Sequence, residues 1–107
     1  EISVFPLLDY LANKDKKAFL EVHKLKLSGF DIFYILTMVF YLLRSLAVTP
    51  KNAPDFVKKK LVRQRVNFPP EKIIDLYEKI LDIEFKLKSG LLEQAQAEFL
   101  LIFLFMD

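Results

Sequence analysis

The segment DIFYILTMVFYLLRSL, residues 31–46, decides the fold, because it carries no charge between Ile32 and Leu43. A membrane-spanning helix needs about 20 mostly apolar residues, so this uncharged run is too short to cross a bilayer. A helix that is apolar on nearly every side has to be covered by other elements. We therefore expect this segment to form the buried central helix of a helical bundle, with no membrane association.

Proline, glycine and capping residues divide the rest of the chain into further helices. Glycine is typical just after the end of a helix, proline is favoured in a first turn, and the residue before proline avoids helical geometry. The predicted helices span residues 4–12, 16–27, 31–48, 54–66, 71–88 and 91–106, and no segment shows the alternation of a strand. The sequence predicts an all-α fold, a compact bundle of five to six helices in a single domain covering residues 1–107.

The composition excludes several kinds of site. The chain has no Cys and one His, which excludes disulfides, zinc–thiolate sites and histidine-based metal clusters. There is no phosphate-binding glycine loop, no nucleophile elbow and no pair of catalytic acids. We expect no cofactor, no metal and no catalytic site. His23 is expected to be an ordinary surface or boundary residue, and the absence of Cys fits the reducing cytoplasm.

Two charged residues lie in apolar surroundings. Glu84 falls near the middle of the apolar face of the helix at 71–88, where a carboxylate is costly unless it is paired. Lys88 follows it at the favourable i+4 spacing, and Arg44, the only charge in the central helix, can bind a carboxylate with two hydrogen bonds. The sequence predicts a structural ion pair between Arg44 and Glu84 with Lys88 nearby. The alternative is a bend that lets Glu84 reach water.

The helix at 54–66 carries a cluster of basic residues opposite an expected apolar side that includes Phe56 and Val62. Most such faces are simply solvated, whereas a phosphate-facing role is the alternative. The candidate DNA-proximal face consists of Lys58, Lys59, Lys60, Arg63 and Arg65.

The last helix ends in a run, Phe99–Met106, in which every residue is apolar. Such a helix is either buried in its own bundle or covered by another subunit, and a domain this small has difficulty covering two such helices. The candidate subunit interface consists of Phe99, Ile102, Phe103, Phe105 and Met106.

The order of several short motifs resembles a known family. The string EFKLKSG, residues 84–90, matches the pattern near the end of the delta subunit of bacterial DNA polymerase III: an acidic residue, two spacers, Leu, Lys, a small residue and Gly. The segment FPLLDYLANKD, residues 5–15, is similar to the opening of that family's C-terminal domain. Arg44 falls on the arginine of its long central helix, and residues 56–61, 67–68 and 97–98 follow in the same order. The chain departs from the family at residues 40–42 and 91–93.

The resemblance implies that the chain is the collar domain of a clamp-loader delta subunit, cut from a longer, non-catalytic protein with N-terminal ATPase-like domains. In that family, collar domains of five subunits pack into a ring during loading of the sliding clamp onto DNA. The expected partners are the other clamp-loader subunits through the collar, the sliding clamp only through the N-terminal domains, and DNA weakly if at all. The alternative is an independent helical nucleic-acid-binding or adaptor domain that uses the basic helix at 54–66.

Overall fold

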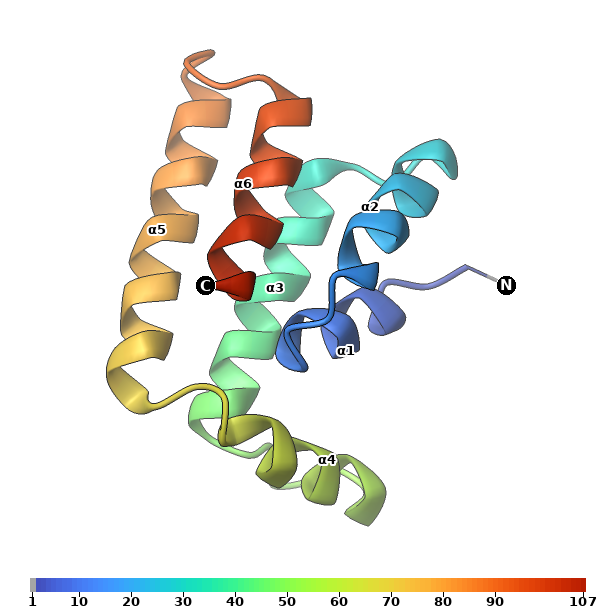
Figure 1. Ribbon diagram of the computed structural model, residues 1–107, viewed down its shortest axis with the longest axis vertical. Coiled ribbons are helices and arrows are strands. Elements are labelled where there is room, and N and C mark those ends of the chain that lie inside the picture. Colours follow the sequence, from blue (N-terminus) through green and yellow to red (C-terminus); the bar gives the residue numbers. More distant parts are fainter. Residues whose placement is uncertain (1) are drawn as a thin grey trace.

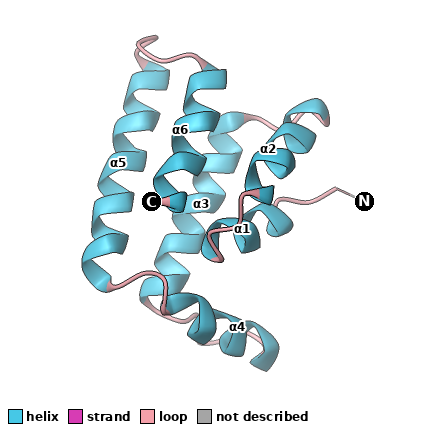
Figure 2. Ribbon diagram, in the orientation of Figure 1, coloured by secondary structure: helices cyan, strands magenta, loops and turns pink. Residues whose placement is uncertain are grey.

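The computed structural model describes residues 2–107, and within that range it contains six α-helices and no strand (Figures 1 and 2). The helices are α1 (Phe5–Ala12), α2 (Lys17–Leu27), α3 (Ile32–Ala47), α4 (Asp55–Arg65), α5 (Pro70–Lys88) and α6 (Gln94–Met106). The predicted all-α bundle is confirmed, and the first five helices begin and end almost where the sequence places them.

The central helix of the bundle is α3, which packs against α1, α4 and α5. Figure 1 shows it behind α6, with α5 on one side and α1 on the other. Asp31 caps its start by accepting a hydrogen bond from the Phe33 N–H at 3.2 Å. Tyr34, Thr37, Tyr41 and Arg44 form a narrow exposed strip, so α3 is covered on every side but one. Its buried residues are Ile32, Ile35, Leu36, Val39, Phe40, Leu42, Leu43, Ser45 and Leu46.

Helices α3 and α5 run antiparallel and are fixed in register by two contacts. The rings of Phe40 and Tyr77 lie 4.8 Å apart, and the Lys88 ammonium lies 6.0 Å from the centre of the Phe33 ring. The first half of α3 therefore lies beside the second half of α5.

Helix α6 closes the bundle by packing against α1, α2 and α5. Phe105 on its inner side contacts Phe68 with 5.9 Å between ring centres. The helix begins later than predicted, because Glu93 forms a capping box in which its N–H donates to the Gln96 Oε1 at 3.0 Å. The preceding turn contains Gly90, whose φ of +74° favours glycine and ends α5.

No helix within residues 2–107 combines the length and the apolar character that crossing a bilayer requires.

Candidate functional site

The structure contradicts the predicted ion pair between Arg44 and Glu84. The contacts between α3 and α5 place Glu84 beside the first half of α3, whereas Arg44 lies in the last turn of that helix. Between two and three helical turns, or roughly 13 Å along the axis, separate the two positions. Arg44 is exposed and forms no ion pair with any residue between 2 and 107.

Glu84 instead pairs within its own helix. Its carboxylate lies 3.9 Å from the Lys88 ammonium, and its side chain is 27 % exposed, so it reaches water at the edge of the apolar face. An exposed i,i+4 pair of this kind contributes only a few tenths of a kcal/mol. The pair therefore has a small structural role. Of the alternative, a bend that lets Glu84 reach water, only the access to water is confirmed.

Arg65, expected on the outer basic face, points inward and caps the end of α3. Its Nε donates to the Leu46 carbonyl at 2.6 Å, and its Nη2 donates to the Ser45 carbonyl at 3.1 Å and to the Thr49 hydroxyl. The last carbonyls of a helix lack partners within the helix and carry partial negative charge, so a guanidinium satisfies them well. Arg65 is therefore removed from the candidate DNA-proximal face.

The other four basic residues of the candidate face are not equivalent. The Lys60 ammonium pairs with the Asp9 carboxylate of α1 at 3.0 Å, and Lys58 is half-buried. Only Lys59 and Arg63 of the predicted set are exposed. The outer basic surface of α4 is therefore smaller than the sequence indicates. A count of charged residues does not show which side of the helix faces the bundle.

The expected apolar side of α4 is also partly wrong. Phe56 and Val62, placed inward by the sequence, are exposed, and the inner side is formed by Val57, Leu61 and Gln64. The sequence alone does not reveal that a glutamine takes a core position.

The predicted subunit interface divides between the two sides of α6. Ile102 and Phe105 are buried in the core and Met106 is half-buried, so these residues do not form a surface. Phe99 and Phe103 are 54 % and 58 % exposed. Buried and exposed residues of α6 follow one another with the period of the helix. The sequence does not reveal which residues face the core, because all eight residues of the run are apolar.

The exposed aromatic residues of α6 continue onto α2. The ring centres of Phe99 and Phe103 lie 5.5 Å apart, and Phe19 of α2 lies 5.5 Å from Phe99. Leu100 extends the apolar area into a shallow hollow beside Phe99. We call these four residues, Phe19, Phe99, Leu100 and Phe103, the aromatic surface. Phe19 was missed by the sequence analysis, since nothing in α2 distinguishes it from other apolar residues.

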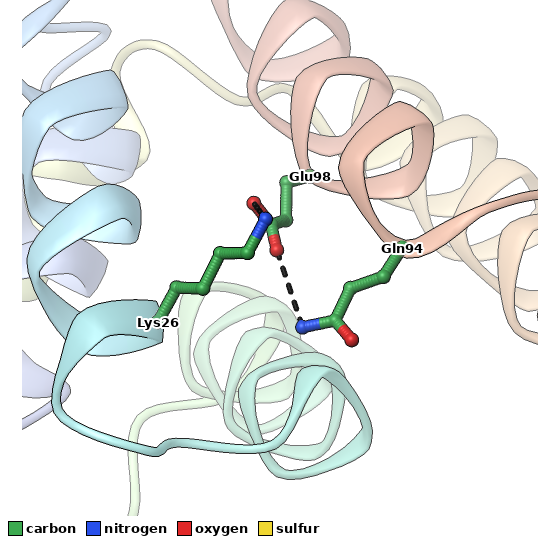
Figure 3. A network of polar contacts seen from close by, with 3 residues as sticks. All are labelled: Lys26, Gln94 and Glu98. Atoms are coloured by element: carbon green, nitrogen blue, oxygen red, sulfur yellow. Dashed lines mark hydrogen bonds and ion pairs between the residues drawn. The ribbon is translucent and has the colours of Figure 1, made fainter.

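A polar contact joins α2 to α6 (Figure 3). The Lys26 ammonium lies 3.8 Å from one oxygen of Glu98, and the Gln94 Nε2 donates to the other oxygen at 3.3 Å. The Glu98 side chain is largely buried. This contact links the end of α2 to the beginning of α6.

Residues 2–107 contain no group of three His, Cys, Asp or Glu side chains that could hold a metal ion, and His23 is exposed. No protein-family model, curated protein or solved structure matches this chain. Its function is therefore inferred from the surfaces and motifs described above.

Proposed function

We propose that this chain is an assembly module, the collar domain of a clamp-loader delta subunit, which holds neighbouring subunits in place while a sliding clamp is loaded onto DNA. The observation that carries the proposal is the aromatic surface of α2 and α6. A module of this kind performs no catalytic step itself and works in the cytoplasm with the replication machinery.

The chemistry of the aromatic surface suits a protein partner. Three phenylalanine rings and Leu100 are exposed side by side, and the outer face of α6 formed by Gln96, Phe99, Leu100 and Phe103 carries no charge. Aromatic residues are enriched at the centres of protein interfaces, whereas charged residues are depleted there. Burial of each large apolar side chain favours association by about 1.5–3 kcal/mol before the costs of binding are subtracted.

The residues that match the delta-subunit motif pack against the core or end a helix in this fold. Leu87 packs against the core, and Lys88 lies over the Phe33 ring and beside Glu84. Gly90 has the positive φ that ends α5. These positions explain the motif by packing and helix termination, which supports a structural module over an enzyme.

The proposal is tested by mixing the full-length parent protein with the other clamp-loader subunits and measuring co-elution by size-exclusion chromatography. We expect the wild-type protein to co-elute and the double variant Phe99→Ser/Phe103→Ser to lose most of that association. Phe85→Ser is the matched control, because Phe85 is exposed to a similar extent on α5, away from this surface. Circular dichroism verifies that each variant folds.

Two results would contradict the proposal. The first is failure of the wild-type parent to join the other subunits. The second is an equal loss of association in the Phe85→Ser control, which would mean that the aromatic surface is not the contact.

DNA contact through α4 is the second candidate function, supported by Lys59 and Arg63, which are exposed next to Phe56. With two or three phosphate contacts, the logarithm of the binding constant would fall with the logarithm of salt concentration with a slope of about −2 to −3. A salt titration with duplex DNA, comparing wild type with Lys59→Gln/Arg63→Gln, distinguishes this function from assembly. Absence of binding at low salt would eliminate it.

A further inference from the structure

A pocket of about 120 Å³ lies between α1, α3 and α4, on elements other than the two that form the aromatic surface. Its inner wall is apolar apart from two residues, Ser45 and Gln64. Phe5 and Tyr41 line its outer part, where both are exposed to solvent. The pocket therefore combines an apolar interior with polar groups at a few places, which is the usual character of a small-molecule site.

Gln64 is the polar group that distinguishes this pocket. Its side chain is 2 % exposed, and its Nε2 is buried without a hydrogen-bond partner among residues 2–107. An unpaired buried amide is unfavourable, and such groups are uncommon in native proteins unless a water or a ligand satisfies them. Gln64 lines the pocket. Its Nε2 is closed off from the open space, so a rotation of the side-chain amide has to turn the Nε2 toward an oxygen atom bound in the pocket before that atom accepts the missing hydrogen bond.

The charges near the pocket are already neutralised. Asp9 and Lys60, which both line it, lie 3.0 Å apart as an ion pair. An ionised ligand would compete with this ion pair for its partners. It would also lose its hydration on entering the pocket, and no free opposite charge there would compensate for that loss. An uncharged ligand avoids both costs.

We propose that this pocket binds a small uncharged molecule that consists of a compact apolar ring or branched alkyl group and one carbonyl or hydroxyl oxygen. The oxygen accepts a hydrogen bond from the Gln64 Nε2, and the apolar part contacts Leu8, Leu42 and Leu61. A closed cavity of about 150 Å³ holds benzene. This pocket of about 120 Å³ opens to solvent beside Phe5 and Tyr41, so a ring of about six atoms fills it with one edge in the opening. The site is separate from the proposed assembly surface and does not depend on it.

The test uses two probes of the same shape, cyclohexanone and methylenecyclohexane, of which only the first carries an oxygen. The probes are titrated into ¹⁵N-labelled protein while the side-chain amide resonance of Gln64 is followed by NMR. Gln94 provides the control resonance, because its amide lies on α6 and is engaged with Glu98. We expect cyclohexanone to give a saturable shift at Gln64 only, with a dissociation constant on the order of a millimolar, and the hydrocarbon to bind about tenfold more weakly.

Two variants extend the test. Gln64→Leu removes the donor and keeps a side chain of similar size. In this variant methylenecyclohexane should bind at least as tightly as cyclohexanone. The backbone amide resonance of Leu61 reports binding, because the variant has no side-chain amide at position 64. Lys60→Gln breaks the ion pair with Asp9 and should leave the affinity for cyclohexanone nearly unchanged. Absence of a saturable shift at Gln64 would show that the pocket holds ordered water only and would overturn the proposal. Equal affinities for the two probes in the wild-type protein would also overturn it.

Discussion

Arg65 provides the sharpest test of how this fold is held together. Its guanidinium bonds the carbonyls of Ser45 and Leu46 and the hydroxyl of Thr49, and it thereby joins the end of α4 to the end of α3. The informative change is Arg65→Met, because methionine keeps much of the aliphatic stem and removes every donor. The buried helix α3 then loses the partner of its last carbonyls.

The magnitude follows from the bonds that are lost. A hydrogen bond from a charged group contributes about 1.5–3 kcal/mol, and a positive charge at a helix C-terminus adds about 0.3–1 kcal/mol. Arg65 is only partly buried, so water replaces some of the lost bonds. We expect the free energy of unfolding to fall by about 2–3 kcal/mol, which corresponds to roughly 8–20 °C in Tm for a domain of this size.

Urea denaturation followed by circular dichroism measures the effect, and Arg63→Met is the matched control. Arg63 lies in the same last turn of α4 but is exposed and forms no ion pair with any described residue. The control should therefore change the free energy of unfolding by no more than about 0.5 kcal/mol. Equal losses in the two variants, or a loss below about 0.5 kcal/mol for Arg65→Met, would refute the capping role.

Three further predictions concern single side chains and are checked by the same denaturation assay. Gln64→Leu should stabilise the ligand-free protein by about 1 kcal/mol, because it removes a buried amide without a partner; a destabilised variant would contradict this. Gly90→Ala should cost about 1 kcal/mol, since alanine is strained at a φ of +74°, whereas Ser89→Ala at the preceding position should cost clearly less. Glu84→Ala should change stability by less than about 0.5 kcal/mol, because its long pair with Lys88 is partly exposed and Glu84 reaches water; a larger loss would contradict this minor role.

The helices of this fold were predictable because their ends depend on neighbouring residues. Ser28-Gly29, Pro50, Pro54 and Gly90 mark boundaries by their own backbone preferences, whatever the rest of the chain does. The start of α6 was placed too early, since Leu91 and Leu92 fit a helical pattern and only the capping box at Glu93 determines the boundary.

The side-chain partners were less predictable because they depend on how separate helices meet. Arg44 and Glu84 have suitable chemistry, but the antiparallel register of α3 and α5 keeps them apart. Arg65 fulfils a capping role that the sequence offered no reason to assign, as the carbonyls it binds lie about twenty residues earlier. In α6, an entirely apolar segment contains no polar residue that would reveal which side faces the core.

The docking of α6 against α1 also determines when this domain can fold during protein synthesis. Helix α6 packs directly against α1, and just beyond the two helices the Lys14 ammonium donates to the Asp107 carbonyl at 2.9 Å. Helix α1 ends at Ala12 and α6 ends at Met106. At roughly 5–20 residues per second, the ribosome needs about 5–19 s after α1 to complete α6. During those seconds a nascent chain presents an unfinished apolar interior, which makes it a natural client for ribosome-associated chaperones until α6 emerges.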